Sequence, residues 1–174
     1  MAEIKRKVFI SYYHHDDEEY RDEFEELFGH LFINKSVNDG DIDSDLGAKY
    51  IKRLIQAGYL TDTSVQVVLI GENTWKRKYV DWEISAAIST RVGGVSGLLG
   101  LLLPTYPGYK ENKYTSSTLP PRFHDNLESG YAKLYKWTES ETNITKYIND
   151  AFDRKSKNSD LIKNGRLQFE RNRS

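Results

Sequence analysis

The sequence predicts an α/β domain built on a parallel five-stranded sheet with helices on both faces. Short apolar, β-rich runs alternate along the chain with segments in which apolar residues recur at helical spacing. The run 65–70 is apolar at nearly every position, which is typical of a central strand covered on both sides. Strands alternating with single helices pair in parallel, and a flavodoxin-like strand order is the simplest topology.

Each element has its own signal in the sequence. The predicted strands are residues 8–10, 32–37, 65–70, 93–103 and 132–137. The first helix is expected to begin at Asp16 or Asp17, either of which can cap it. Its core stripe consists of Tyr20, Phe24, Leu27, Phe28 and Leu31. The other predicted helices are residues 46–55, a third whose buried face carries Val80, Ile84, Ala87 and Ile88, and a last one at 138–152.

The remaining segments set the domain boundaries. Residues 104–130 are rich in Pro, Gly, Ser, Tyr and Asn, which predicts a long surface excursion within one domain spanning 1–156. Residues 157–174 form a basic C-terminal tail, and a charge run of this kind is typically solvated and frayed.

Composition excludes several classes of protein. The chain has 174 residues, 38% of them hydrophobic, which is enough for one buried core. It has no cysteine, so disulfides, thiolate metal sites and a cysteine nucleophile are excluded, and a cytoplasmic location is expected. A net charge of −1 gives no case for nucleic-acid binding. The longest apolar stretch, 95–103, is too short to cross a membrane, and the N-terminus lacks a signal peptide.

Glu83 is the most unusual feature of the third helix. At about 100° per residue, Trp75, Tyr79 and Glu83 fall within about 80° of one another, on the shoulder of the buried face. A carboxylate there is partly desolvated and walled by aromatic rings, a setting in which a pKa tends to rise. An ordinary boundary glutamate whose head reaches water remains the alternative. A helix starting at Trp75 would carry Glu83 about 12 Å from the strand ends, whereas a short irregular turn over 75–78 would bring it back.

Two other kinds of site receive little support. His14 and His15 precede two aspartates, but adjacent histidines rarely reach one ion and no second cluster has ligand spacing, so we predict no metal site. A phospho-receiver domain needs an aspartate at the end of the third strand, where this chain has Ile70 and Gly71.

Three stretches then resemble a known family: residues 7–13 (KVFISYY), 68–75 (VLIGENTW) and 79–84 (YVDWEI). The chain is similar to TIR-like domains, and specifically to the small bacterial TIR proteins of the Thoeris anti-phage defence system, the ThsB type. Residues 119–122 and 132–137 fit the same layout.

The resemblance implies an NAD⁺-processing enzyme with Glu83 as its catalytic carboxylate and NAD⁺ as substrate, with no cofactor. The product would be an ADP-ribose-derived signal, cyclic or conjugated, that activates a separate effector protein after a phage-derived trigger. The resemblance places Ser11 and Tyr12 near the nicotinamide ribose, and the loop 38–46 corresponds to one used in homo-oligomeric assembly.

Trp75 and Tyr79 are expected to wall the site that the resemblance implies. Asp45, at the start of the second helix, is a weaker candidate for a polar contact. A non-catalytic TIR-like sensor or scaffold remains the alternative, since fold does not fix function.

Overall fold

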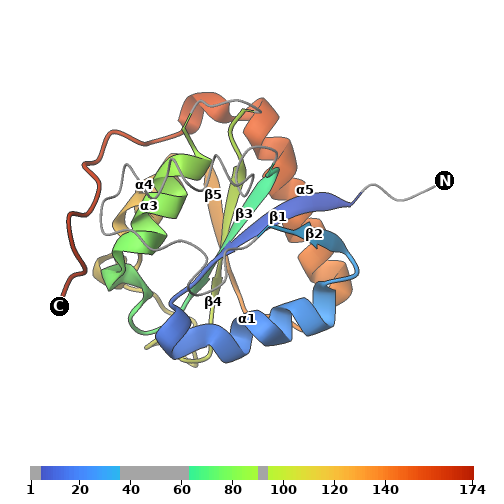
Figure 1. The fold of residues 1–174 in the computed structure, drawn as a ribbon, viewed down its shortest axis with the longest axis horizontal. Helices are drawn as coiled ribbons and strands as arrows, with labels where there is room; N and C mark the ends of the chain where they lie inside the picture. Colours follow the sequence, from blue (N-terminus) through green and yellow to red (C-terminus); the bar gives the residue numbers. More distant parts are fainter. Residues whose placement is uncertain (1–4, 36–62, 90–93) are drawn as a thin grey trace.

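The computed structural model describes residues 5–35, 63–89 and 94–174 (Figure 1). Its centre is one parallel sheet in the order β2-β1-β3-β4-β5. The strands are β1 (Arg6–Ser11), β2 (Phe32–Asn34), β3 (Val65–Ile70), β4 (Gly97–Leu102) and β5 (Ala132–Lys136). This is the flavodoxin-like order, and the predicted α/β class with a five-stranded parallel sheet is confirmed.

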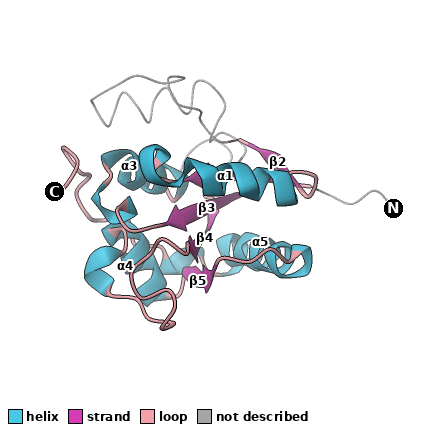
Figure 2. Ribbon diagram, turned by 90° about the horizontal axis from the view of Figure 1, so that it is seen from below, coloured by secondary structure: helices cyan, strands magenta, loops and turns pink. Residues whose placement is uncertain are grey.

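Helices cover both faces of this sheet (Figures 1 and 2). On one face lie α1 (His14–Phe28) and α5 (Glu141–Lys157), and on the other lie α3 (Lys78–Ala87) and α4 (Pro121–Ser129). Three short 3₁₀ turns complete the described elements: η1 (Thr74–Lys76), η2 (Ser116–Thr118) and η3 (Ser159–Leu161). The helix predicted at 46–55, and with it Asp45, lies outside the residues that the structure describes.

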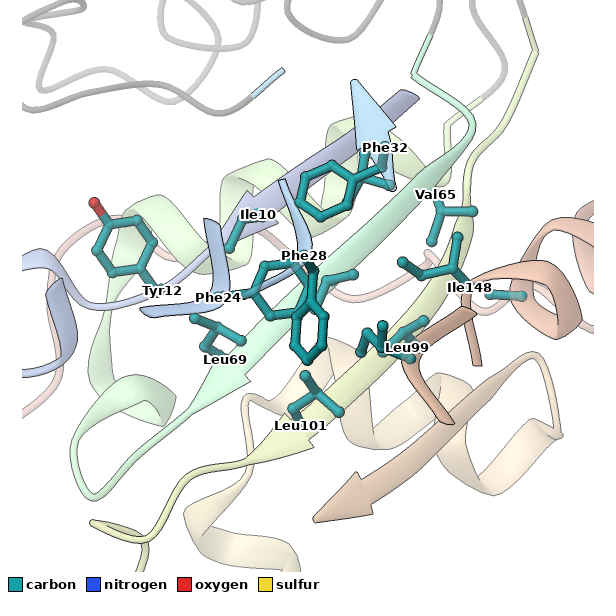
Figure 3. Close-up of a cluster of buried hydrophobic side chains, with 14 of the residues drawn as sticks. Ile10, Tyr12, Phe24, Phe28, Phe32, Val65, Leu69, Leu99, Leu101 and Ile148 are labelled. Atoms are coloured by element: carbon teal, nitrogen blue, oxygen red, sulfur yellow. The ribbon is translucent and has the colours of Figure 1, made fainter. Parts of the chain in front are cut away.

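The larger apolar cluster lies between the sheet and α1 with α5 (Figure 3). Phe24 and Phe28 of α1 are fully buried in it, and their rings meet edge to face at 5.1 Å. They pack against alternate residues of β3, while the intervening residues Val68 and Ile70 belong to the cluster beneath α3 and α4. The continuous apolar run in β3 is therefore explained by burial on both faces, as predicted.

Gly97 sets how closely α5 approaches the sheet. A Cβ at this position would lie 2.1 Å from the Ala151 carbonyl oxygen, so only glycine lets the α5 backbone pack directly on β4. This contact fixes α5 against the start of β4.

The start of α1 differs from the prediction. The N-cap residue is Tyr13, whose carbonyl oxygen accepts hydrogen bonds from the amides of Asp16 and Asp17 at 3.2 and 2.9 Å. Neither aspartate caps the helix, because both carboxylates bond elsewhere: Asp16 accepts from Asn73, and Asp17 accepts from Thr105. Asp17 also departs from helical geometry, with φ −125° and ψ 15°.

The excursion at 104–130 contains a helix that the sequence pattern did not reveal. Helix α4 begins with Pro121 in its first turn and ends at Gly130, which adopts a left-handed conformation with φ 91°. Both boundary signals are present in the sequence. The helix was missed because it is only nine residues long and mostly polar.

The C-terminal tail is packed against the domain rather than frayed, which corrects the prediction. Phe169 is 5% exposed. Its amide donates to Asp81 Oδ2 at 2.9 Å, and its carbonyl oxygen accepts from Trp82 Nε1 at 2.7 Å. Figure 1 shows the tail, in red, running along the layer of α3 and α4. The burial of Phe169 and its two buried hydrogen bonds stabilise the docked tail, although the surrounding charged residues favour contact with water.

None of the described helices combines the length and the apolar character that a membrane span requires.

Candidate functional site

The chain enters α3 through an irregular turn, as predicted from the position of Glu83. After β3, the Gly71 amide donates to Thr74 Oγ1 at 2.8 Å, and this bond closes the turn that leads into η1. Arg77 then returns to extended geometry, with φ −93° and ψ 122°, before α3 begins at Lys78. Glu83 therefore lies five residues into the helix, about 7.5 Å along its axis, rather than about 12 Å.

Glu83 is buried, with 5% of its surface exposed. Val80 and Ile84 of the same helix pack against the sheet, and Asp81 faces α4, where it pairs with Arg122. At about 100° per residue, Glu83 lies on the other side of Val80 from Asp81. Since α3 contacts both β1 and β3, this flank is the one nearer β1.

Ser11 lies in the same layer as Glu83. It ends β1, and strand alternation places it opposite Ile10, on the face that α3 covers. Gln66 of β3 confirms this placement, since its Nε2 donates to Ser11 Oγ at 2.8 Å in the protein interior. Gln66 was not singled out from the sequence, although a polar residue inside an apolar strand was a usable signal. Its Oε1 has no hydrogen-bond partner in the described part of the chain.

Tyr12 is directed to the other face of the sheet. Its ring belongs to the cluster beneath α1 (Figure 3). The ring stacks on His14 at 4.1 Å, and the hydroxyl lies 3.2 Å from His14 Nδ1. The structure therefore brings Ser11, but not Tyr12, into the layer of Glu83.

The two predicted aromatic walls have different surroundings. Tyr79 lies one helical turn before Glu83 and contacts the Trp82 ring edge to face at 5.3 Å. Trp75 sits in η1 and lines grooves whose other walls come from the C-terminal tail, η2 and α4. Trp75 thus faces the tail, while Tyr79 lies close to Glu83 in its angular position around the axis of α3.

Asp17 is a further buried acid at this end of the sheet. It is fully buried, and Oδ2 has no hydrogen-bond partner among the described residues. Burial away from water, assisted by the negative charge of Asp16, raises the pKa of Asp17 to about 6, against opposing hydrogen bonds from threonine hydroxyls. A Cβ on Gly71 would lie 2.5 Å from Oδ2, so the carboxyl group packs directly on the end of β3. Because Asp17 is surrounded in sequence by other acidic residues that are exposed, no sequence pattern marked it as buried.

The adjacent histidines have different partners. His14 meets Tyr12, whereas His15 Nδ1 lies 2.9 Å from Asp16 Oδ1. Within residues 5–35, 63–89 and 94–174, no three His, Cys, Asp or Glu side chains gather where they could hold a metal ion.

Comparisons with known proteins identify relatives of this architecture. Residues 9–106 match the family described as "Thoeris protein ThsB, TIR-like domain". No curated protein matches the chain. Among solved structures, the chain is similar to the TIR domains of the activated Roq1 resistosome recognising the pathogen effector XopQ. That match has 10% identity and a TM-score of 0.42, and it covers 87% of this chain and 84% of the other.

Proposed function

The chain belongs to the TIR-like domain family of the Thoeris protein ThsB, and on that premise we propose that it cleaves the nicotinamide–ribose bond of NAD⁺ with Glu83 as the catalytic carboxylate. One observation supports this proposal most strongly. Glu83 is a buried carboxylate on the flank of α3 nearer β1, five residues into the helix that follows the carboxyl end of β3. Ligands of open parallel sheets bind beyond the carboxyl ends of the strands.

A single carboxylate is sufficient for this reaction. The nicotinamide of NAD⁺ is a cationic leaving group, so the electrons of the breaking bond neutralise its ring nitrogen and no acid catalyst is needed. The ribose is left with oxocarbenium character, as in glycoside hydrolysis. A fixed anion beside that cation stabilises the transition state more than the ground state, and burial strengthens the effect.

The second step decides the product. If water attacks the ribose carbon, it loses a proton and ADP-ribose forms. If water is excluded and a hydroxyl or ring nitrogen attacks instead, the product is a cyclic or conjugated ADP-ribose. We propose that a product of this second kind is the signal that reaches the effector.

Ser11 is the best placed of the other predicted contacts. Its Oγ accepts from Gln66, so the hydroxyl proton is left to donate to a ribose oxygen. Tyr79, one turn from Glu83, is the proposed wall of the pocket. Tyr12 and Trp75 are left out of this proposal, because Tyr12 lies on the other face of the sheet and Trp75 faces the C-terminal tail, while Asp45 lies outside the described residues and stays a prediction.

Family membership supports a place for the reaction in anti-phage defence. We propose that a phage-derived cue switches the protein on in the cytoplasm, that homo-oligomerisation completes the site, and that the nucleotide product activates a separate effector.

The test is NAD⁺ turnover by purified protein, with and without heat-treated lysate of phage-infected cells, resolved by mass spectrometry. The proposal predicts loss of NAD⁺ and release of nicotinamide, with a product mass that separates hydrolysis from conjugation. Lysate without protein is the control. If NAD⁺ stays intact under every condition, the proposal is wrong and the protein is a sensor or scaffold.

A further inference from the structure

A pocket separate from Glu83 lies on the tail side of α3, between η1, η2, α4 and the C-terminal tail. It has a volume of about 440 Å³. Its walls include Trp75, Ser116, Ser117, His124, Arg166 and Arg173. Glu83 is not part of this pocket, so the proposed NAD⁺ reaction does not account for it.

Two guanidinium groups line the pocket, and one of them is already paired with a carboxylate. Arg166 is held by a bidentate pair with Asp125, with distances of 2.8 and 2.9 Å. The Arg173 amide donates to the Lys76 carbonyl oxygen at 2.8 Å, and its guanidinium carbon lies 4.2 Å from the centre of the Phe169 ring. None of the ion pairs among the described residues involves Arg173. Among the described residues, none that lines the pocket is acidic.

The start of α4 favours the same sign of ligand. Pro121 and His124, in the first turn of this nine-residue helix, line the pocket. Pro121 has no amide proton, and the His124 amide donates to the Pro120 carbonyl oxygen at 2.9 Å, so these two residues offer a ligand no backbone donor. The macrodipole of α4, which is positive at this end, still favours an anion beside the two arginines. Ser116 and Ser117 add hydroxyl donors from η2.

Trp75 adds an aromatic surface to this anion-binding set. An indole ring stacks on a planar base, while guanidinium groups bind phosphate oxygens. We propose that this pocket binds a nucleotide, with its base on Trp75 and its phosphate between Arg166, Arg173 and the start of α4. The pocket exists because the tail packs against α3, so binding there would also hold the tail in place.

The experiment measures binding of AMP by isothermal titration calorimetry. AMP carries no nicotinamide bond and is not cleaved, so binding is measured without turnover. Because AMP is one half of NAD⁺, substitutions in this pocket, rather than wild-type binding alone, distinguish it from the proposed NAD⁺ site. Adenosine and inorganic phosphate are titrated separately, to test the base and the phosphate in turn. The variants are R173A and W75A, with W75F as the conservative partner. R171A is the matched control, because Arg171 is an exposed arginine of the same tail that does not line this pocket. Circular dichroism verifies folding.

We expect saturable AMP binding by the wild type, weakened roughly tenfold or more in R173A and W75A. R171A and W75F should stay within about twofold of the wild type. Absence of saturable binding at millimolar AMP would overturn the proposal, as would equal losses in R171A and R173A. If phosphate alone bound as tightly as AMP, the base would have no place on Trp75. If adenosine bound as tightly as AMP, the phosphate would contribute nothing to binding and the proposed phosphate site would be wrong.

Discussion

Replacing Asp17 by Asn removes the one acid at the strand ends that is fully buried with a carboxylate oxygen unpaired in the described part of the chain. Asn has nearly the same volume but cannot ionise, so the change isolates the effect of the charge. Burial raises the pKa of Asp17 from 3.8 to about 6 in the folded protein. At 1.36 kcal/mol per pKa unit, the ionised group costs the fold about 3 kcal/mol.

The direction of the pH dependence follows from this shift. The unfolded chain releases the Asp17 proton near pH 3.8, whereas the folded protein retains it until about pH 6. The contribution of Asp17 to stability is therefore complete below the unfolded pKa and is lost as the pH rises through the folded pKa. Between pH 5 and pH 8, this group lowers the free energy of unfolding by about 1.4 kcal/mol.

Urea unfolding followed by tryptophan fluorescence at pH 5, 6, 7 and 8 measures the effect. The stability of D17N relative to wild type should rise by about 1.4 kcal/mol across this range, with about two thirds of the change complete by pH 6. D153N, which changes an exposed aspartate of α5, is the matched control and should follow the wild-type profile. A D17N difference that stays constant from pH 5 to pH 8 would show that Asp17 is not protonated in the folded protein near pH 6.

Two further substitutions test the packing around α3. Arg122 pairs with Asp81 at 3.0 Å with both side chains buried, so R122M should cost about 3–5 kcal/mol in urea unfolding by leaving the Asp81 charge uncompensated. Adding D81N should recover part of that loss, and a cost under about 1 kcal/mol for R122M alone would contradict the argument. F169A should cost about 3 kcal/mol by emptying the buried anchor of the tail. L167A, at a residue that is 90% exposed, should change stability by less than about 0.5 kcal/mol, and equal effects would mean that the tail is not docked.

The layout of the fold was accessible from the sequence because it rests on local patterns. The apolar run of β3, the Phe24 and Phe28 stripe of α1, and the spacing of the strands all report burial directly. The irregular turn before α3 could also be inferred, since a regular helix from Trp75 would have carried Glu83 away from the strand ends.

The parts that were missed depend on contacts between distant residues. Phe169 docks on Trp82, which lies 87 positions earlier in the chain. No local sequence pattern in a charged tail predicts that contact. Asp17 resembles its exposed neighbours in sequence and differs from them only in being covered by the loops after β3 and β4. Tyr12 follows Ser11 directly, yet strand alternation sends the two side chains to opposite faces.

The central claim is that the Glu83 carboxylate stabilises the ribosyl cation during NAD⁺ cleavage. The most direct measurement compares initial rates of nicotinamide release by wild type, E83Q and E72Q under the condition that activates the wild type. Glu72 is an exposed glutamate in the loop after β3, so E72Q makes the same chemical change at the same end of the sheet. The account predicts that E83Q loses about 10²–10³-fold in kcat with little change in KM, while E72Q stays near the wild-type rate. Equal turnover in wild type and E83Q would contradict it.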